Sequence, residues 1–364
     1  MDNENTKPNE DLKRKSESAM LGLSTKPSVL NFKSMVAGDM DLENWMRDLA
    51  GNLRDVPVIY LAIPGSHDSM SYGITRSSSL APDAEPVLHR LDPLFKGTIL
   101  RWTITQTADT LQQLQMGIRY FDLRVATKMD TENLFFTHGL YADEISKPLL
   151  LVQEFIASHP QEVVILDFQH FYNFAAEDHQ RLMGLLLQMF GVKLCPRRVN
   201  LLPITLNSME RLGQQIIIIY RHQAVYSTSE FWQPQAMPSP WPRREKANDL
   251  VTFFENLRRP AGMGFVHQAV LTPTPAFILL RWISNLRTKC AIPVQKVVLP
   301  KLADFTPGPP SGTDLDSSKA TINVIIADFV ELNDSLFSKT VINLNLKLLR
   351  NTDVVYHNGY QVNG

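Results

Sequence analysis

Short runs of apolar, β-branched residues alternate with segments of helical periodicity along most of the chain. Such runs predict strands, because β-branched side chains suit extended backbone and turn residues bound the runs. The predicted strands are Val58–Ile63, Arg119–Ala126, Leu134–Gly139, Val163–Phe168, Ile216–Arg221, Gly262–Val270 and Ile322–Val330. The spacing of apolar residues predicts helices at residues 41–50, Thr107–Gly117, Leu149–Ser158 and Asp178–Phe190, and from the last strand to about Leu349. In the first of these helices, Trp45 and Met46 are expected to face inward. Two stretches rich in proline, Pro234–Pro242 and Pro300–Gly312, are predicted to be loops.

Strands that are apolar throughout are typical of a parallel sheet buried on both faces. Seven of them, separated by helices, favour an α/β fold, namely a distorted or incomplete (β/α)8 TIM-type barrel. A doubly wound parallel sheet is the alternative. The polar, aperiodic residues 1–40 are expected to be a flexible tail, residues 41–350 the barrel, and residues 351–364 a C-terminal tail.

Composition narrows the class of protein further. Hydrophobic residues make up 44% of the chain and the formal net charge is −1, which excludes wholesale disorder and the basic excess of nucleic-acid-binding proteins. No stretch approaches the roughly 20 apolar residues that cross a bilayer, and the first residues lack the apolar core of a secretory signal. Two cysteines, Cys195 and Cys290, cannot form a disulfide framework. We therefore expect a cytoplasmic protein that meets membranes only peripherally.

Chemistry-bearing side chains recur where the predicted strands end. In a barrel, the C-terminal ends of the strands form one rim, where catalytic residues gather. One isolated histidine or aspartate there is more often structural, for instance a helix cap, but several at successive strand ends indicate a site. No phosphate-binding loop, dinucleotide fingerprint or G-x-S-x-G motif is present. The residues at this rim are His67, Asp68, Asp122, Arg124, His138, Asp167, Gln169, Arg221 and Asp328.

Two histidines and an arginine suit the cleavage of a phosphodiester by an internal hydroxyl group. One neutral imidazole accepts the proton of the attacking hydroxyl, and a second, protonated imidazole donates a proton to the leaving oxygen. An arginine neutralises the charge that builds on the phosphoryl oxygens. Carboxylates beside the histidines fix their tautomers and adjust their pKa values.

Four segments resemble the X domain of phosphatidylinositol-specific phospholipase C. They are IPGSHDSMSY (Ile63–Tyr72), GIRYFDLRVA (Gly117–Ala126), FFTHGLY (Phe135–Tyr141) and HPQEVVILDF (His159–Phe168). The layout is most similar to the small eukaryotic proteins that contain an X domain without a Y domain or other modules, and the resemblance covers roughly residues 40–350.

The resemblance implies an enzyme without a catalytic metal. The calcium-dependent branch of the family has Glu-x-Asp where this chain has Asp122-Leu123-Arg124, asparagine in place of Asp68, and glutamate in place of Gln169. A fixed Arg124 guanidinium could take the place of the calcium charge, as in the metal-free bacterial branch. We therefore expect no metal ligands and no cofactor, calcium included.

By the same resemblance, His67 is the general base, His138 the general acid and Arg124 the phosphate-binding group. Asp68 supports His138 and Asp328 supports His67, while Arg221 and Gln169 contact the substrate. The implied reaction converts a phosphoinositide lipid to diacylglycerol and a cyclic or open inositol phosphate. One alternative is a non-catalytic phosphoinositide-binding or scaffold protein on the same barrel. A glycerophosphodiester phosphodiesterase is another, although it would be expected to carry Glu-x-Asp metal ligands.

Overall fold

The structure is a computed structural model that describes residues 40–84, 96–260, 262–309 and 321–350. Apart from Met40, the two predicted tails lie outside the described residues.

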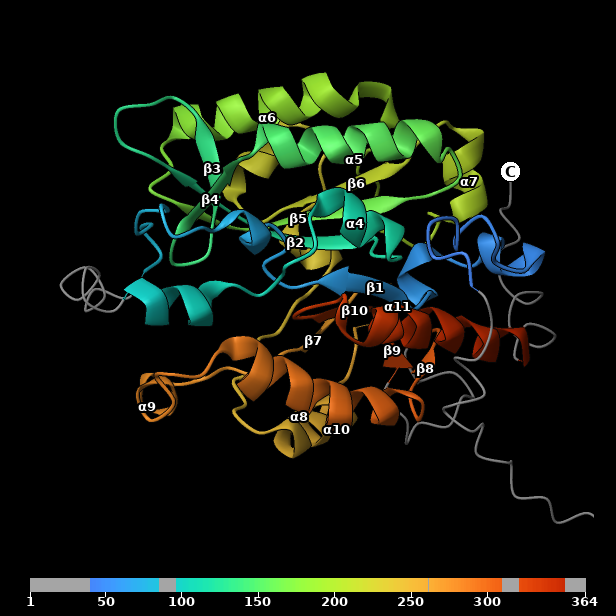
Figure 1. Ribbon diagram of the computed structural model, residues 1–364. Coiled ribbons are helices and arrows are strands. Elements are labelled where there is room, and N and C mark those ends of the chain that lie inside the picture. Colours follow the sequence, from blue (N-terminus) through green and yellow to red (C-terminus); the bar gives the residue numbers. More distant parts are fainter. Residues whose placement is uncertain (1–39, 85–95, 261, 310–320, 351–364) are drawn as a thin grey trace, which may run out of the picture. The chain divides into compact units, whose positions relative to one another are not determined.

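A sheet of six parallel strands forms the centre of the fold (Figure 1). Its order is β6 (Ile216–Tyr220), β5 (Val164–Tyr172), β2 (Tyr120–Thr127), β1 (Ile63–Ser66), β10 (Val324–Ala327) and β7 (Val266–Ala269). Two antiparallel strands, β3 (Leu134–Thr137) and β4 (Tyr141–Glu144), extend from the second half of β2. Strands β8 (Thr306–Pro307) and β9 (Thr321–Ile322) form a separate two-residue ladder.

The barrel is not closed by a continuous ladder between its outer strands, β6 and β7. A proline-rich segment lies between them instead. The Trp232 N–H donates to the Ile218 carbonyl of β6, while the carbonyls of Ala236 and Pro238 accept from Gly264 and Val266 on the other side. Prolines cannot donate to a ladder, so this segment bonds only at intervals. The prediction of an incomplete (β/α)8 barrel is confirmed, and this segment largely lacks regular structure, as predicted.

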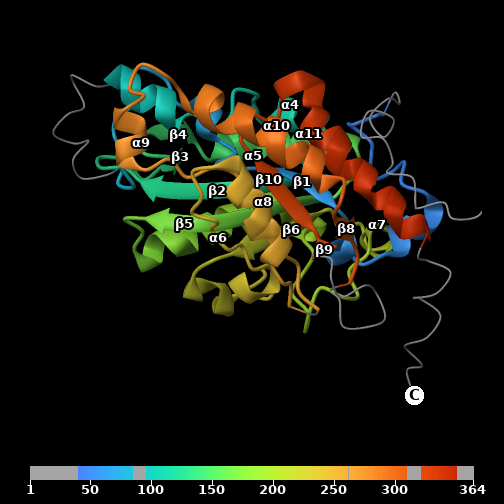
Figure 2. The ribbon, with the colours of Figure 1, turned by 90° about the horizontal axis from the view of Figure 1, so that it is seen from below.

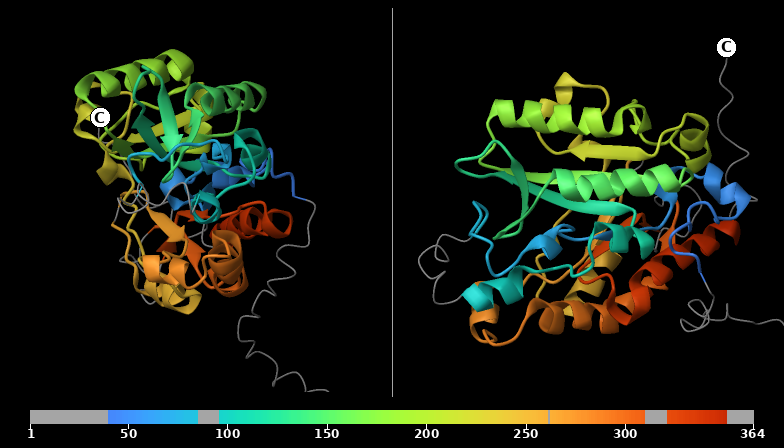
Figure 3. Two further views of the ribbon diagram at one scale, coloured as in Figure 1. Left: turned by 60° about the vertical axis from the view of Figure 1, so that its left-hand side comes forward. Right: turned by 45° about the horizontal axis from the view of Figure 1, so that its top comes forward.

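A helix over residues 96–103 and the helices α4 to α11 surround the sheet. Helices α5 and α6 run side by side on one side of the sheet (Figure 1). The right-hand view of Figure 3 shows the same two helices, in green, with this side turned forward. On the other side α10 packs against α8 and α11, and α11 also packs on β1 (Figure 2). The helices are α4 (Thr110–Gln115), α5 (Ser146–Ser158), α6 (Ala176–Phe190), α7 (Leu206–Arg211), α8 (Ala247–Asn256), α9 (Pro275–Leu279), α10 (Ile292–Leu302) and α11 (Leu332–Asn343).

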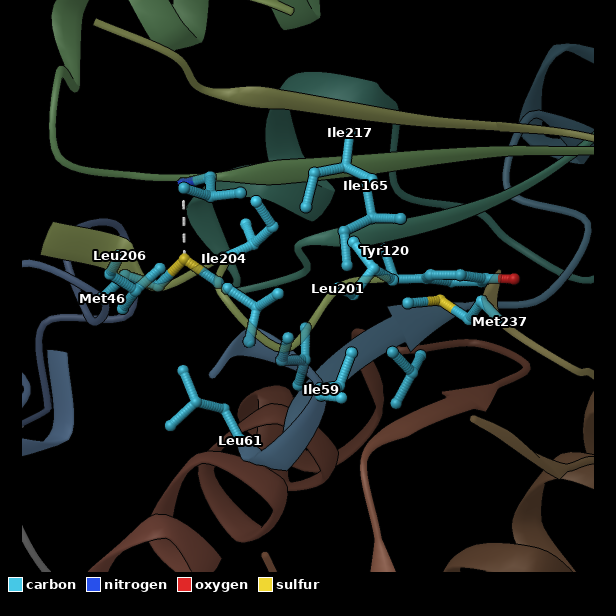
Figure 4. Close-up of a cluster of buried hydrophobic side chains, with 14 of the residues drawn as sticks. Met46, Ile59, Leu61, Tyr120, Ile165, Leu201, Ile204, Leu206, Ile217 and Met237 are labelled. Carbon is cyan, nitrogen blue, oxygen red and sulfur yellow. Dashed lines mark hydrogen bonds between the residues drawn. The ribbon is translucent and has the colours of Figure 1, made fainter. Parts of the chain in front are cut away.

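The barrel interior is apolar at the N-terminal ends of the strands (Figure 4). One buried cluster takes alternate residues from adjacent strands, as the two-residue repeat of a strand requires. Two positions further along the same faces, the side chains become charged. Tyr120 is followed by Asp122 and Arg124, and Ile165 by Asp167. The apolar members of this cluster include Ile63, Tyr120, Ile165, Ile217, Ile219, Val266, Val324 and Ile326.

Three predicted elements are wrong in their details. Val58–Tyr60 is a 3-10 turn, and the strand begins only at Ile63, because the apolar side chains of this run close the base of the barrel without pairing. Residues 41–50 form turns rather than a helix, since the N–H groups of Met46 and Arg47 donate to the Glu162 carboxylate. Trp45 and Met46 are nevertheless buried. Pro300 lies in α10 rather than in a loop.

We predict that Gly65→Ala destabilises the fold. A Cβ atom on Gly65 would lie 2.9 Å from both Ile326 and Tyr120, so the core would have to shift, at a cost of about 1–3 kcal/mol. The matched control is Gly184→Ala on the exposed side of α6, where no atom lies within 4 Å of the new Cβ and helix propensity predicts a gain of about 1 kcal/mol. Urea unfolding followed by circular dichroism measures both changes. Equal stability of the two variants would contradict the close packing around β1.

Candidate functional site

The shortness of β1 creates the site. β1 pairs with the start of β2 and ends at Ser66, so the rest of the same β2 edge pairs with β3 instead. The end of β1, the middle of β2 and the end of β3 therefore meet. Asp68 has a φ of 40°, a left-handed conformation that turns the chain sharply away from the sheet.

His67 lies in a buried cluster of carboxylates. Its Nδ1 atom is 2.7 Å from Oδ1 of Asp328 on the adjacent strand end. Its Nε2 atom lies 3.2 Å from Oδ2 of Asp68 and 3.2 Å from the Nη2 atom of Arg124. Burial by itself lowers the pKa of His67, but Asp68 and Asp328 outweigh it and raise that pKa to about 9. The two carboxylates therefore favour the charged form of His67.

Asp68 joins the two histidines and the arginine. Its Oδ1 atom is 2.5 Å from Nε of Arg124, and its Oδ2 atom is 3.0 Å from Nε2 of His138. Burial raises the pKa of Asp68, but Arg124, His138 and His67 outweigh it, and the pKa lies below its usual range. These contacts are short ion pairs rather than aligned hydrogen bonds, so charge holds the group together.

Both ring nitrogens of His138 face oxygen acceptors. Nδ1 lies 2.6 Å from the Thr103 carbonyl, and Nε2 faces Asp68. The ring centroids of His138 and His67 are 6.2 Å apart, well inside the roughly 10 Å over which both can reach one phosphate. His138 is the more open of the two, with 23% of its side chain exposed against 6% for His67.

The position of Arg124 determines whether a metal ion suits this site. Among the described residues, His67, Asp68 and Asp122 are the one group of three potential ligands placed closely enough to share an ion. The Arg124 guanidinium contacts all of them, including Oδ2 of Asp122 at 3.5 Å. Its positive charge already balances these carboxylates, and three side chains fall short of the six to eight oxygen ligands that calcium takes. The residues present do not suit a calcium ion.

Arg221 and Gln169 belong to a neighbouring network. Arg221 donates two hydrogen bonds to Asp167, at 2.8 and 2.7 Å, and Asp167 also accepts from the Tyr120 hydroxyl at 2.6 Å. Gln169 donates to the same hydroxyl and lies at a bulge in β5, opposite the step from Leu123 to Arg124. Burial raises the pKa of Asp167 despite its arginine partner. No hydrogen bond or ion pair among the described residues joins Arg221 or Gln169 directly to the histidines.

Trp241 is the site residue that sequence reasoning missed. Its ring lies 5.3 Å from the His67 ring and 5.7 Å from the Arg124 guanidinium, so it flanks both. It comes from the proline-rich segment between β6 and β7, where no periodicity marks a residue as facing the site. A lone tryptophan in such a segment was the available signal.

The chain and its fold both match known proteins. No protein-family model matches the chain. Human PI-PLC X domain-containing protein 3 is 33% identical over 316 residues, which cover 84% of this chain and 94% of that protein. Mouse PI-PLC X domain-containing protein 2 is 35% identical over 310 residues (83% of this chain, 87% of that protein), and mouse protein 1 is 35% identical over 319 residues (85% and 88%).

Solved structures of bacterial phosphatidylinositol-specific phospholipase C have the same fold. A Staphylococcus aureus variant aligns with a TM-score of 0.58 and 17% identity, covering 83% of this chain and 97% of that chain. The Listeria monocytogenes enzyme aligns with a TM-score of 0.52 and 19% identity, covering 84% and 98%. The protein therefore has a phospholipase C-type barrel. It belongs to the family of PI-PLC X domain-containing proteins, as the four sequence segments indicated.

We predict that His67 titrates near pH 9, because Asp68 and Asp328 favour its charged form. Asp328→Asn removes one of these charges and should lower the pKa of His67, while the amide keeps a hydrogen-bonding group next to Nδ1. Nuclear magnetic resonance of ring-labelled histidines measures both values. A His67 pKa below 7 in the wild-type protein, or no change in the variant, would contradict this account of the buried charges.

Proposed function

We propose that this protein is a phosphoinositide phospholipase C, a phosphoric diester hydrolase that cleaves phosphatidylinositol lipids. The observation that carries the proposal is the pair of histidines 6.2 Å apart, on either side of Asp68, with Arg124 in contact with one of them. A scaffold or binding protein would not need two imidazoles and a guanidinium held together by buried carboxylates.

The reaction uses the histidines in opposite roles. His67 Nε2 takes the proton of the inositol 2-hydroxyl as that oxygen attacks phosphorus, and the bond from phosphorus to the diacylglycerol oxygen breaks. His138 gives the proton on its Nε2 to that leaving oxygen. The products are diacylglycerol and a cyclic inositol phosphate, which water opens by the reverse proton transfers. His67 must be neutral to begin, so the limb of the pH profile that His67 controls should rise as the pH approaches its pKa of about 9.

Two carboxylates and an arginine support these steps. Asp328 holds the His67 ring through Nδ1, and Asp68 holds His138. Burial lowers the pKa of Arg124, but Asp68 and Asp122 more than restore it, so the guanidinium stays charged and can neutralise the phosphoryl oxygens. We propose that this fixed cation acts where related enzymes use calcium, and that no metal takes part. Arg221 and Gln169 are proposed to contact the inositol ring.

An apolar surface beside the site suits contact with a lipid bilayer. In and directly after α9, Leu279, Leu280, Trp282 and Ile283 expose 53–80% of their surface. α9 follows the C-terminal end of β7. Arg101 donates a hydrogen bond to the Trp282 carbonyl, and Thr103, two residues after Arg101, contacts His138 through its carbonyl. Aromatic and aliphatic side chains with nearby arginines are typical of peripheral membrane contact. We propose that this surface brings the site to its lipid substrate. No helix in the described part of the chain is long and apolar enough to span a membrane.

The decisive experiment measures the turnover of phosphatidylinositol in vesicles by His67→Asn and His138→Asn. The asparagine amide can still donate to Asp328 or to the Thr103 carbonyl, so folding is preserved better than by alanine. We expect each variant to lose about 10²–10⁴-fold in turnover, and the double variant to lose little more than the worse single one. His159→Asn, remote from the site and stacked on Phe155, is the matched control. Lipid binding without turnover by the wild type would favour the non-catalytic alternative.

Activity should persist in a calcium chelator. Arg124 supplies the positive charge that calcium supplies elsewhere, so chelation removes nothing that the reaction needs. Arg124→Lys keeps the charge but loses the planar fork that matches phosphate oxygens, and should lower turnover strongly. Turnover that disappears in chelator and returns with added calcium would refute the metal-free mechanism.

Leu280→Ser with Ile283→Ser should weaken binding to phosphatidylinositol vesicles by at least about tenfold, since two apolar side chains no longer enter the bilayer. Hydrolysis of a water-soluble inositol phosphodiester should be unchanged. Val192→Ser, at another exposed apolar residue, serves as the control for surface polarity. Unaltered vesicle binding by the double variant would show that membrane contact lies elsewhere.

A further inference from the structure

A cavity of about 290 Å³ lies at the opposite end of the barrel from the histidines. It is placed where β6 and β7 do not pair, between the residues that precede β7 and the segment around Trp232. One of its lining residues, Leu201, packs in the same buried cluster as Val58 and Ile59, which precede β1. The cavity therefore opens at the N-terminal ends of the strands.

The lining of this cavity is positively charged. Its charged residues are Arg197 and Arg198, and it contains no carboxylate. Arg197 is held by a hydrogen bond from Nη1 to the Val225 carbonyl, which leaves its other nitrogens to face a ligand. Within the described ranges, neither guanidinium forms an ion pair, and Arg198 has no hydrogen-bond partner either. Arg197 is half-buried and Arg198 is exposed, whereas the fully buried Arg119 and the largely buried Arg221 are paired with carboxylates.

Amide side chains complete the lining. Asn200 accepts the Leu202 N–H through Oδ1, which directs its NH2 group away from that backbone. Gln233 and Gln235 add further donors and acceptors. Two guanidinium groups bind phosphate oxygens well, and amides bind hydroxyl groups. The cavity volume is at the small end of the range for ligand sites, so it suits a compact molecule.

We propose that this cavity binds a small, water-soluble phosphate ester through Arg197 and Arg198. A lipid headgroup is not the expected ligand, because the apolar surface proposed to meet a bilayer lies at the other end of the strands. The proposal concerns binding alone and does not depend on the reaction proposed for the histidines.

Hydrogen–deuterium exchange of the full chain tests the proposal, because it locates the ligand. Inorganic phosphate and glucose 6-phosphate are titrated, with glucose as the neutral control. Amides in residues 197–201 and 232–236 should become protected by glucose 6-phosphate and not by glucose. Arg197→Gln and Arg198→Gln should each raise the half-saturating concentration of glucose 6-phosphate at least about tenfold, because each variant loses a charged hydrogen-bond donor. Arg211→Gln, an exposed arginine outside the cavity, should leave it unchanged.

Several results would overturn the proposal. Protection confined to the segments around His67 and Arg124 would assign phosphate binding to the catalytic site alone. An equal loss in Arg211→Gln would show non-specific attraction to surface charge. Protection by phosphatidylinositol vesicles at residues 197–201 would assign the cavity to a lipid headgroup instead. Because the readout is local, inactivity of the enzyme toward lipids would not affect any of these conclusions.

Discussion

The buried carboxylate of Asp68 is the interaction on which the site depends. Asp68 contacts His67, His138 and Arg124, while Asp122 and Asp328 each contact at least one of these three groups. Three carboxylates thus surround Arg124 and His67, whose side chains are largely buried. Removing Asp68 would leave the Arg124 charge without its shortest ion pair, and leaving a buried charge uncompensated is far costlier than losing an exposed ion pair.

The same strands contribute core residues near their N-terminal ends and site residues near their C-terminal ends. Along each inward face, apolar residues fill the base of the barrel, and polar or charged residues follow at the C-terminal end. Tyr120 stands at the boundary, because its ring packs in the core while its hydroxyl group donates to Asp167. The apolar base fixes the strand positions, and these fix the distances between the site residues with little freedom. The four-residue length of β1 matters equally, since a longer strand would occupy the β2 edge that β3 needs.

Periodicity and strand ends predicted the barrel and the group formed by His67, Asp68, Arg124, His138 and Asp328. That prediction was possible because parallel strands place their ends at one rim, so that positions in the sequence translate into positions in space. Contributions from outside the strands could not be predicted in this way. The Thr103 carbonyl lies at the end of the helix over residues 96–103, and the Trp241 ring lies in a segment without a repeat. The prediction of a strand at Val58–Tyr60 was wrong because burial in the core, and not strand pairing, accounts for its apolar residues.

The pairing of β1 with β10 joins residues more than two hundred and fifty positions apart, such as Ile63 with Val324. During synthesis, His67 emerges long before Asp328, its carboxylate partner. Until β10 is made, one edge of β1 is open and the buried charges of the site are unbalanced. Long-range pairing of this kind slows folding and leaves strand edges exposed to other chains. A messenger truncated before the last strand would therefore yield an aggregation-prone fragment rather than a protein with a weakened site, because β10 carries the chain to Asp328.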